Sequence, residues 1–316
     1  MKAPTNRKKL KNLELVKNWK LYILALPALL IFFIFAYLPL PGIVLAFERY
    51  TLEGGIFGSE WVGFANFDLF FLTADVGKLL GNVLSINLSG LIVNTIVTVF
   101  TAICLNQLFS TKAQKAYQNI LFLPYFFSAI MMVRLAMLFF DDTKGVINLL
   151  LQQSGLQSIE FSKVGGVWVP IVVVTSLIKG LGYGIIVYLA TITGMDESIY
   201  EAARIDGAGR MVQIFRITLP LLRPTIILLT LMSVGRMFFG DFVYLSAFSG
   251  TNEVIRDRLD VFETFIFRNL TSGSLYASPD YGLNAAVGLF QSLLGFVMIF
   301  GCNLIVRKID KDSALF

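Results

Sequence analysis

A polar segment between two long apolar stretches has the residue types and spacing of a short exposed helix. Ser198 stands three residues before Glu201, which is a capping-box pattern at the start of a helix. Ala202 and Ala203 favour helix, and Gly207 can end it. We therefore predict a short helix here whose small side chains are available to another protein.

A second amphipathic stretch follows this helix and runs up to Pro220. Its apolar face holds Met211, Ile214 and Phe215, and its polar residues are Arg210, Gln213 and Arg216. The two parts together predict a helix-turn-helix that lies along a membrane surface. A compact exposed helix suits docking into a groove of another protein, and a merely helical linker is the alternative.

Four charged side chains fall inside apolar stretches, namely Arg134, Lys179, Arg236 and Asp241. A charge in lipid costs roughly 2.5–3.5 kcal/mol on insertion scales, so such residues face protein or a wet cavity. Arg236 and Asp241 are five residues apart, which places them roughly 140° apart around a helix. We therefore expect Asp241 to pair with Arg134 or Lys179 on a neighbouring helix, and lining a solute path is the competing role.

The composition excludes several kinds of chemistry. The chain has no histidine and two cysteines, Cys104 and Cys302, which stand far apart in apolar stretches. Ser-His and Cys-His nucleophiles and the usual zinc spacings are therefore missing. Gly77-Lys78-Leu79 lacks the hydroxyl of a phosphate-binding loop, so we predict no ATPase site in this chain. We expect no metal site, no bound cofactor and no catalytic residues.

The elements that must position these residues are membrane-spanning helices. Of the 316 residues 56% are apolar and 15% charged, which is typical of a protein surrounded by lipid. Spans of about 20 residues are needed to cross a bilayer. Six apolar stretches are long enough, at Leu21–Ala46, Val83–Leu108, Tyr117–Phe140, Val167–Ala190, Leu222–Ala247 and Tyr281–Val306.

The distribution of charge predicts the orientation of these spans. Well over half of the 26 Lys and Arg residues fall in the tails and in the loops at 109–116 and 191–221. Cytoplasmic segments carry this excess of basic residues, so both termini are predicted to be cytoplasmic. We divide the chain into a basic tail at 1–20, a transmembrane domain at 21–306 with its core at 83–306, and a cytoplasmic tail at 307–316. The cytoplasmic loop 191–221 belongs to that core.

The pattern of this loop resembles a known family. Residues 201–220 match E-A-A-x3-G-x9-I-x-L-P at every fixed position, which is the signature of binding-protein-dependent ABC importer permeases. The resemblance implies the type I permease fold, an all-α integral membrane protein with six transmembrane helices. It implies that the first helix of the loop couples to an ATPase subunit. The coupling positions are then Glu201, Ala202, Ala203, Asp206, Gly207, Ile217, Leu219 and Pro220.

Weaker motifs resemble the carbohydrate branch of the same family, notably permeases for complex oligosaccharides. They are Val62–Phe67, Tyr188–Gly194, Gly288–Ser292 and the ending Arg307–Phe316. The resemblance implies a multi-pass protein of a prokaryotic plasma membrane. It also implies four partners: a second permease in a heterodimer, two ATPase subunits that bind ATP and Mg, and an extracytoplasmic solute-binding protein.

A path for sugars calls for hydroxyls, amides and aromatic rings rather than net charge. Tyr183, Tyr244, Asn284 and Gln291 fit this description. The alternative is that they hydrogen-bond other helices, as polar residues of membrane bundles do. Gly180, Gly182 and Gly184 allow bending or close helix approach.

Other functions stay open on the sequence alone. An ion-coupled secondary carrier would use Asp241 and Arg236 as coupling groups. An ABC permease for a solute other than a sugar and a membrane-bound sensor are further alternatives.

Overall fold

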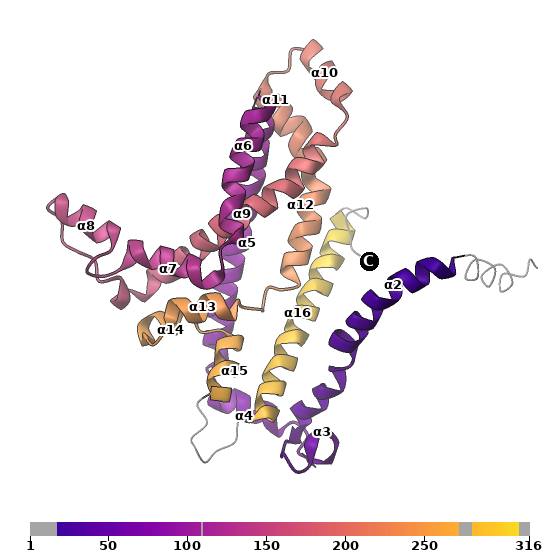
Figure 1. Ribbon diagram of the computed structural model, residues 1–316, viewed down its shortest axis with the longest axis vertical. Coiled ribbons are helices and arrows are strands. Elements are labelled where there is room, and N and C mark those ends of the chain that lie inside the picture. Colours follow the sequence, from indigo (N-terminus) through magenta and orange to yellow (C-terminus); the bar gives the residue numbers. More distant parts are fainter. Residues whose placement is uncertain (1–17, 109, 272–279, 310–316) are drawn as a thin grey trace, which may run out of the picture.

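The computed structural model describes residues 18–108, 110–271 and 280–309 (Figure 1). Within these ranges the regular secondary structure is helical apart from one antiparallel pair, β1 (Glu48–Arg49) with β2 (Glu60–Trp61). The terminal tails predicted at 1–20 and 307–316 fall largely outside the described residues, as does most of the ending that resembles the carbohydrate branch.

Five continuous helical segments are long and apolar enough to cross a membrane. They are Trp19–Phe47, Val76–Asn106, Gly165–Thr193, Arg210–Val234 and Tyr281–Lys308. The principal helices in them are α2 (Trp19–Phe32), α5 (Val76–Asn106), α9 (Trp168–Thr193), α12 (Leu219–Val234) and α16 (Tyr281–Ile309). A bent pair of helices supplies a sixth crossing if it counts as one span, so the predicted helical membrane fold is confirmed.

The third predicted span, Tyr117–Phe140, is wrong as one straight helix. It consists of α6 (Thr111–Phe122), a 3-10 turn η3 (Leu123–Phe126) and α7 (Ala129–Phe140), with a bend of 101°. Pro124 lacks the N–H that would continue the helix, and Ser128 caps α7 by accepting a bond from the Met131 N–H at 3.2 Å. A proline followed by a cap therefore divides this span.

The fifth predicted span, Leu222–Ala247, is also wrong at its C-terminal end. Helix α12 stops at Val234, and a separate helix α13 (Phe242–Ser249) begins after a turn. Asp241 is the N-cap of α13, because its carboxylate accepts a bond from the Tyr244 N–H at 3.0 Å. Asp241 thus lies at a helix break, and α13 packs against α7, the second half of the other broken span.

The second amphipathic stretch does not end at Pro220. Helix α11 (Arg210–Gln213), a π-helical turn η6 (Ile214–Thr218) and α12 form one continuous segment. Pro220 has no N–H to donate to a helical hydrogen bond, and its ring crowds the preceding turn. The wider π-turn, in which the Leu219 N–H donates to the Ile214 carbonyl, makes room for this proline. The stretch is therefore the start of the fifth span rather than a helix along the membrane surface.

Shorter elements connect the spans. They are the helices α3 (Gly55–Gly58), α4 (Ala65–Thr73), α8 (Val146–Gln153), α10 (Glu197–Ile205), α14 (Glu253–Leu259) and α15 (Phe262–Thr271), together with the 3-10 turn η4 (Phe161–Lys163). Three further turns lie within spans: η1 (Phe33–Tyr37) and η2 (Leu40–Phe47) in the first, and η5 (Gly165–Val167) before α9. In Figure 1 α10 lies at one end of the long axis, and α3 and α4 lie at the other.

Helix α9 is the centre of the packing. Its Gly182 approaches the backbone of α6 so closely that a Cβ would lie 2.4 Å from the Phe122 Cα atom, and a Cβ at Gly184 would lie 2.8 Å from a Thr98 side-chain atom of α5. Buried Ile185 and Leu222 belong to a cluster between α5, α9 and α12. The predicted close helix approach is confirmed at Gly182 and Gly184 but not at Gly180, where a Cβ would lie 3.8 Å from its nearest neighbour.

Candidate coupling segment and membrane-depth polar residues

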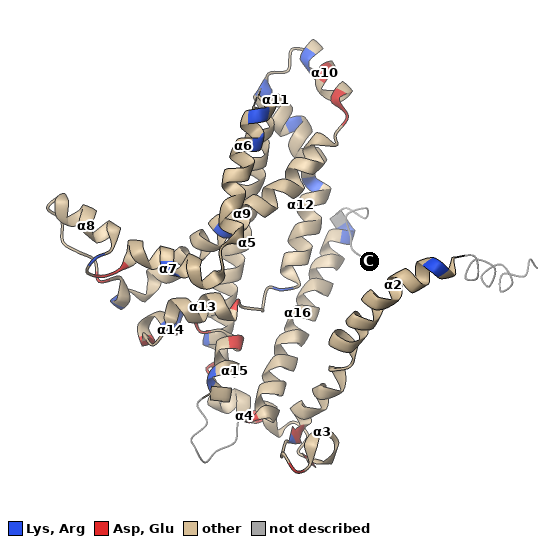
Figure 2. Ribbon diagram, in the orientation of Figure 1, with Lys and Arg blue, Asp and Glu red and all other residues tan. Residues whose placement is uncertain are grey.

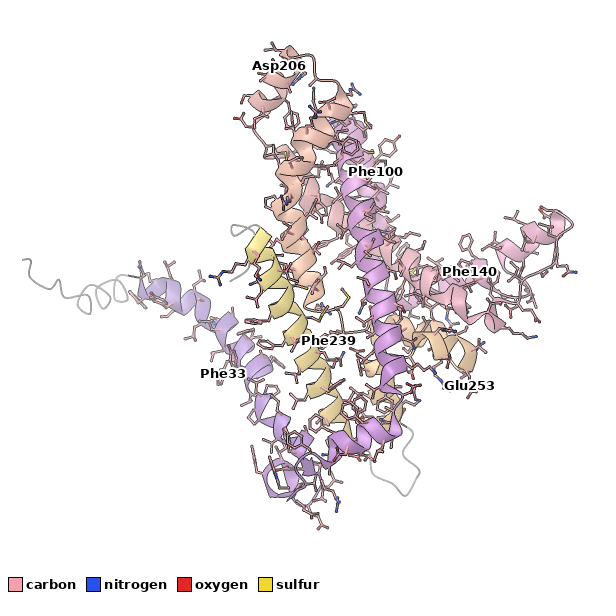
Figure 3. All side chains as sticks on the ribbon, turned by 180° about the vertical axis from the view of Figure 1, so that it is seen from behind. Phe33, Phe100, Phe140, Asp206, Phe239 and Glu253 are labelled. Carbon is pink, nitrogen blue, oxygen red and sulfur yellow. The ribbon has the colours of Figure 1, made fainter. Side chains whose placement is uncertain are left out.

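Helix α10 stands at the far end of the molecule, where Figure 3 labels Asp206. None of its residues is buried. Its N-cap is Asp196, whose carboxylate accepts a bond from the Ser198 N–H at 2.9 Å, so the predicted capping box at Ser198 and Glu201 is wrong. This backbone hydrogen bond, with help from the Ser198 side chain, lowers the pKa of the Asp196 carboxyl.

The C-terminus of α10 is fixed by a Schellman motif. The Ala208 N–H donates to the Ala203 carbonyl at 2.8 Å, and the Gly207 N–H donates to the Arg204 carbonyl at 3.1 Å. Gly207 has a φ of 78°, in the left-handed region that glycine adopts without strain. The prediction that Gly207 ends the helix is confirmed.

The residues of the loop signature divide between two elements. Glu201, Ala202 and Asp206 are exposed on α10, and among the described residues the Glu201 carboxylate accepts no hydrogen bond. Ile217, Leu219 and Pro220 lie in the continuous helix that becomes the fifth span. The signature therefore joins an exposed helix to a spanning one.

One side-chain contact connects these two elements. The Tyr200 hydroxyl of α10 lies 3.0 Å from the hydroxyl of Thr218, whose side chain is buried in the π-turn. Neither residue was singled out from the sequence, because the signature does not include them. This hydrogen bond is a direct side-chain link between α10 and the fifth span.

Several large apolar side chains are exposed on α10 and on the start of the fifth span. Ile205 is 86% exposed, and Ile199, Met211 and Phe215 are exposed beside it in the chain. Figure 2 shows basic residues on α6, α10 and α11 at the same end, whereas the middle parts of the long helices are nearly free of charge. An apolar surface edged by polar residues is typical of a protein-binding site.

The charged residues at membrane depth do not pair as the sequence predicted. Lys179 Nζ donates to the backbone carbonyls of Tyr125 at 3.2 Å and Phe127 at 2.8 Å, at the break of the third span. Across the described ranges no ion pair joins Asp241 to Arg134 or Lys179, because Asp241 caps α13 and Lys179 binds main-chain oxygen. Arg134 and Arg236 are exposed.

The four predicted path residues have different surroundings. Tyr183 is 57% exposed and stacks on Tyr125. Tyr244 is buried, and its hydroxyl lies close to the Thr175 side chain without forming a hydrogen bond. Asn284 is buried, and neither atom of its amide has a hydrogen-bond partner in the described part of the chain.

Gln291 is engaged within the protein. Its amide donates to the Phe238 carbonyl at 2.8 Å and to the Glu263 carboxylate at 2.6 Å. Its contacts are thus those of a residue that joins helices, the alternative considered from the sequence.

A polar clamp that the sequence did not predict holds the break of the fifth span. The clamp consists of Asn87, Glu263 and Gln291, from α5, α15 and α16. Asn87 Nδ2 donates to the carbonyls of Met237 at 2.7 Å and Phe239 at 3.0 Å, and Glu263 accepts from the Gly240 N–H at 2.9 Å. Figure 3 places Phe239 near the middle of the molecule. Irregular backbone at membrane depth needs such partners, because lipid offers none.

No group of three or more His, Cys, Asp or Glu residues suited to a metal ion is present among residues 18–108, 110–271 and 280–309. Cys104 and Cys302 are both free. The functional features that remain are the exposed helix, the broken spans and the polar residues at membrane depth.

Comparison with known proteins decides the family. Residues 94–311 match the family described as binding-protein-dependent transport system inner membrane component. The chain belongs to this family. It is therefore a multi-pass component of a bacterial inner membrane, and this membership replaces the ion-coupled carrier and the sensor that the sequence left open.

Relatives agree over nearly the whole length. Protein LplB of Bacillus subtilis (strain 168) is 36% identical, with 93% of this chain and 90% of that protein covered. The polygalacturonan/rhamnogalacturonan transport system permease protein YteP of the same organism is 31% identical, with 95% and 92% covered. One similar structure is the crystal structure of a bacterial alginate ABC transporter in complex with an alginate pentasaccharide-bound periplasmic protein. A chain of that structure superposes on this one with a TM-score of 0.82 and 29% sequence identity, and the match covers 94% of this chain and 97% of that chain.

Proposed function

We propose that this protein is the permease subunit of an ATP-binding-cassette importer that moves a sugar or oligosaccharide across the inner membrane. One observation carries the proposal: the loop signature of the family forms an exposed helix, α10, at the end of the spanning bundle. The names of relatives that transport polygalacturonan, rhamnogalacturonan or alginate support a saccharide as cargo.

The coupling function follows from how α10 is attached. Asp196 and the Schellman motif make it a short rigid helix, and the Tyr200–Thr218 bond ties it to the fifth span. A partner that pulls on α10 would therefore move the C-terminal end of α9 and the start of the fifth span together. Opening and closing of that partner would reach the bundle through these two helices.

The remaining partners complete the proposal. Two separate ATPase subunits bind ATP and Mg and supply the hydrolysis, a second homologous permease forms the heterodimer, and a solute-binding protein delivers cargo from outside. The basic residues near α10 support a cytoplasmic position for this end and for both termini. In this arrangement the chain itself needs no catalytic residue and no cofactor.

A substitution on α10 tests the proposal. Ile205→Asp puts a charge on an apolar side chain that is 86% exposed, so it should leave the fold intact and abolish co-purification with the ATPase subunits. ATP-dependent uptake into proteoliposomes should be lost with it. The matched control is Leu150→Asp on α8, also an exposed apolar position. Normal ATPase association of the Ile205→Asp variant would contradict the proposal.

A further inference from the structure

Two arginines lie at the same depth on helices α12 and α16. Helix α12 leads away from the α10 end of the molecule and α16 leads towards it, and Figures 1 and 3 both show the two side by side. They touch where α12 ends, because a Cβ at Gly295 would lie 3.2 Å from the Gly235 carbonyl oxygen. Arg223 precedes Gly235 by twelve residues, and Arg307 follows Gly295 by twelve. At about 1.5 Å per residue, each arginine is roughly 18 Å from this contact, towards the α10 end.

These arginines have no anionic partner in the part of the chain that the structure describes. Arg223, Arg307 and the adjacent Lys308 are exposed, and none of them belongs to an ion pair there. Neither α12 nor α16 contains an Asp or a Glu. Figure 2 shows basic residues on α12 and at the C-terminal end of α16. Three positive charges are therefore exposed near one depth without a carboxylate to neutralise them.

An apolar stripe leads from Arg307 along α16. Leu293, Phe296, Phe300 and Leu304 are all exposed, and with Arg307 they follow one another at intervals of three or four residues, so they share one face of the helix. The rings of Phe296 and Phe300 stack at 6.0 Å. From Leu293 to Arg307 the stripe is about 21 Å long, more than half of the roughly 30 Å hydrocarbon core of a bilayer. An acyl chain can lie along such a stripe, whereas a soluble protein docked at the α10 end cannot reach its far part.

We propose that Arg223, Arg307 and Lys308 form a binding site for an anionic phospholipid in the leaflet at the α10 end, and we call these three residues the lipid site. The phosphate accepts charge-assisted hydrogen bonds from the two guanidinium groups, whose planar fork matches phosphate oxygens. Axes of packed helices are about 8–10 Å apart, so one headgroup can lie between side chains of both helices. The acyl chains lie against Phe296 and Phe300. This site does not depend on the proposed function, because it involves no cargo and no ATPase.

Lipid binding by the full-length protein tests the lipid site. The protein, purified in detergent, is titrated with phosphatidylglycerol and separately with phosphatidylcholine of the same acyl chains, and lipid-bound species are counted by native mass spectrometry. One basic residue near an anionic headgroup is worth about fivefold in affinity. Arg223→Gln and Arg307→Gln should therefore each weaken binding of phosphatidylglycerol about fivefold, and the double variant about twenty-five-fold. Binding of phosphatidylcholine should stay unchanged, and Arg223→Lys should keep most of the affinity.

A matched variant separates the lipid site from a general effect of charge. Lys115→Gln removes one exposed positive charge at the same end of the molecule, on α6, and should leave binding of phosphatidylglycerol unchanged. Thermal unfolding of each variant shows whether a loss reflects folding. Arg307 lies in the last turn of α16, so the Arg307→Gln result stands where the Arg223→Gln chain does not fold.

Four outcomes would overturn the lipid site. The first is equal affinity of the wild type for the two lipids, and the second is an equal loss in Lys115→Gln and Arg307→Gln. The third is displacement of phosphatidylglycerol by an equal concentration of inorganic phosphate, which would show that a free anion suffices. The fourth is loss of co-purifying ATPase subunits from the arginine variants with lipid binding unchanged, which would assign these side chains to a protein interface.

Discussion

Replacing Asn87 with leucine should destabilise the protein by removing one side of the polar clamp. Leucine has a similar shape but cannot donate, so the carbonyls of Met237 and Phe239 each lose a bond, of 2.7 and 3.0 Å. Met237 is only 3% exposed, and a turn carbonyl has no helical partner to replace the amide. Polar contacts in membrane bundles are each worth about 0.6 kcal/mol on average and up to about 1.7. Two of them give a loss of roughly 1–3 kcal/mol.

The free energy of unfolding is measured by SDS titration in mixed micelles, followed by circular dichroism. Asn94→Leu is the matched control on the same helix, because Asn94 makes one bond, to the Thr98 hydroxyl at 2.9 Å, and touches no turn carbonyl. Its loss should stay near 0.6 kcal/mol. Equal unfolding free energies for the two variants would refute the reasoning that Asn87 holds the break.

Three further predictions concern α9 and α10. Gly207→Ala, at a φ of 78°, should cost roughly 1–2 kcal/mol and reduce ATP-dependent uptake, whereas Gly209→Ala, at a φ of −65°, should be neutral in both measurements. Gly182→Ala would place its Cβ 2.4 Å from a backbone atom and should lower the free energy of unfolding by roughly 1–3 kcal/mol. Gly180→Ala, whose Cβ would lie 3.8 Å from the nearest atom, should leave it unchanged. Similar melting temperatures for the two variants would contradict the close packing of α9. The Asp196 carboxyl, whose pKa lies below the ordinary 3.8, stabilises α10 at neutral pH, and this stabilisation should vanish as pH falls through that lowered pKa. Hydrogen exchange of the α10 amides measures the effect, which should be absent in Asp196→Asn.

The exposed helix was predictable because its signals are local. Ala202, Ala203 and Gly207 lie within two helical turns of one another, and propensity and left-handed glycine geometry act within a few residues. The N-cap was misplaced by two residues, which is also a local effect. The Asp196 carboxylate, two residues before Ser198, accepts the hydrogen bond from the Ser198 N–H that Glu201 would accept in a capping box. A shift of two residues is the usual precision of such a boundary.

The broken spans were not predictable from hydropathy. Residues around Pro124 are as apolar as the helices that flank them. Near Gly240 the charges of Arg236 and Asp241 are averaged with the apolar run of residues 237–239, so the average over a span hides each break. The breaks exist because residues distant in the chain satisfy the released backbone groups: Lys179 at the third span, and Asn87, Glu263 and Gln291 at the fifth.

The sequence by itself determined that the chain crosses a membrane several times, that residues 201–220 carry the permease signature, and that Gly207 ends a helix. Those properties depend on composition and on neighbours within one or two turns. Only the tertiary structure decided which polar residues at membrane depth bind backbone, cap a helix or stay open. That choice depends on which helices meet, because in a medium without water a polar group has only the partners that the fold brings to it. Lys179 therefore meets the carbonyls of another span, and Tyr183 stacks on Tyr125 while it stays largely exposed.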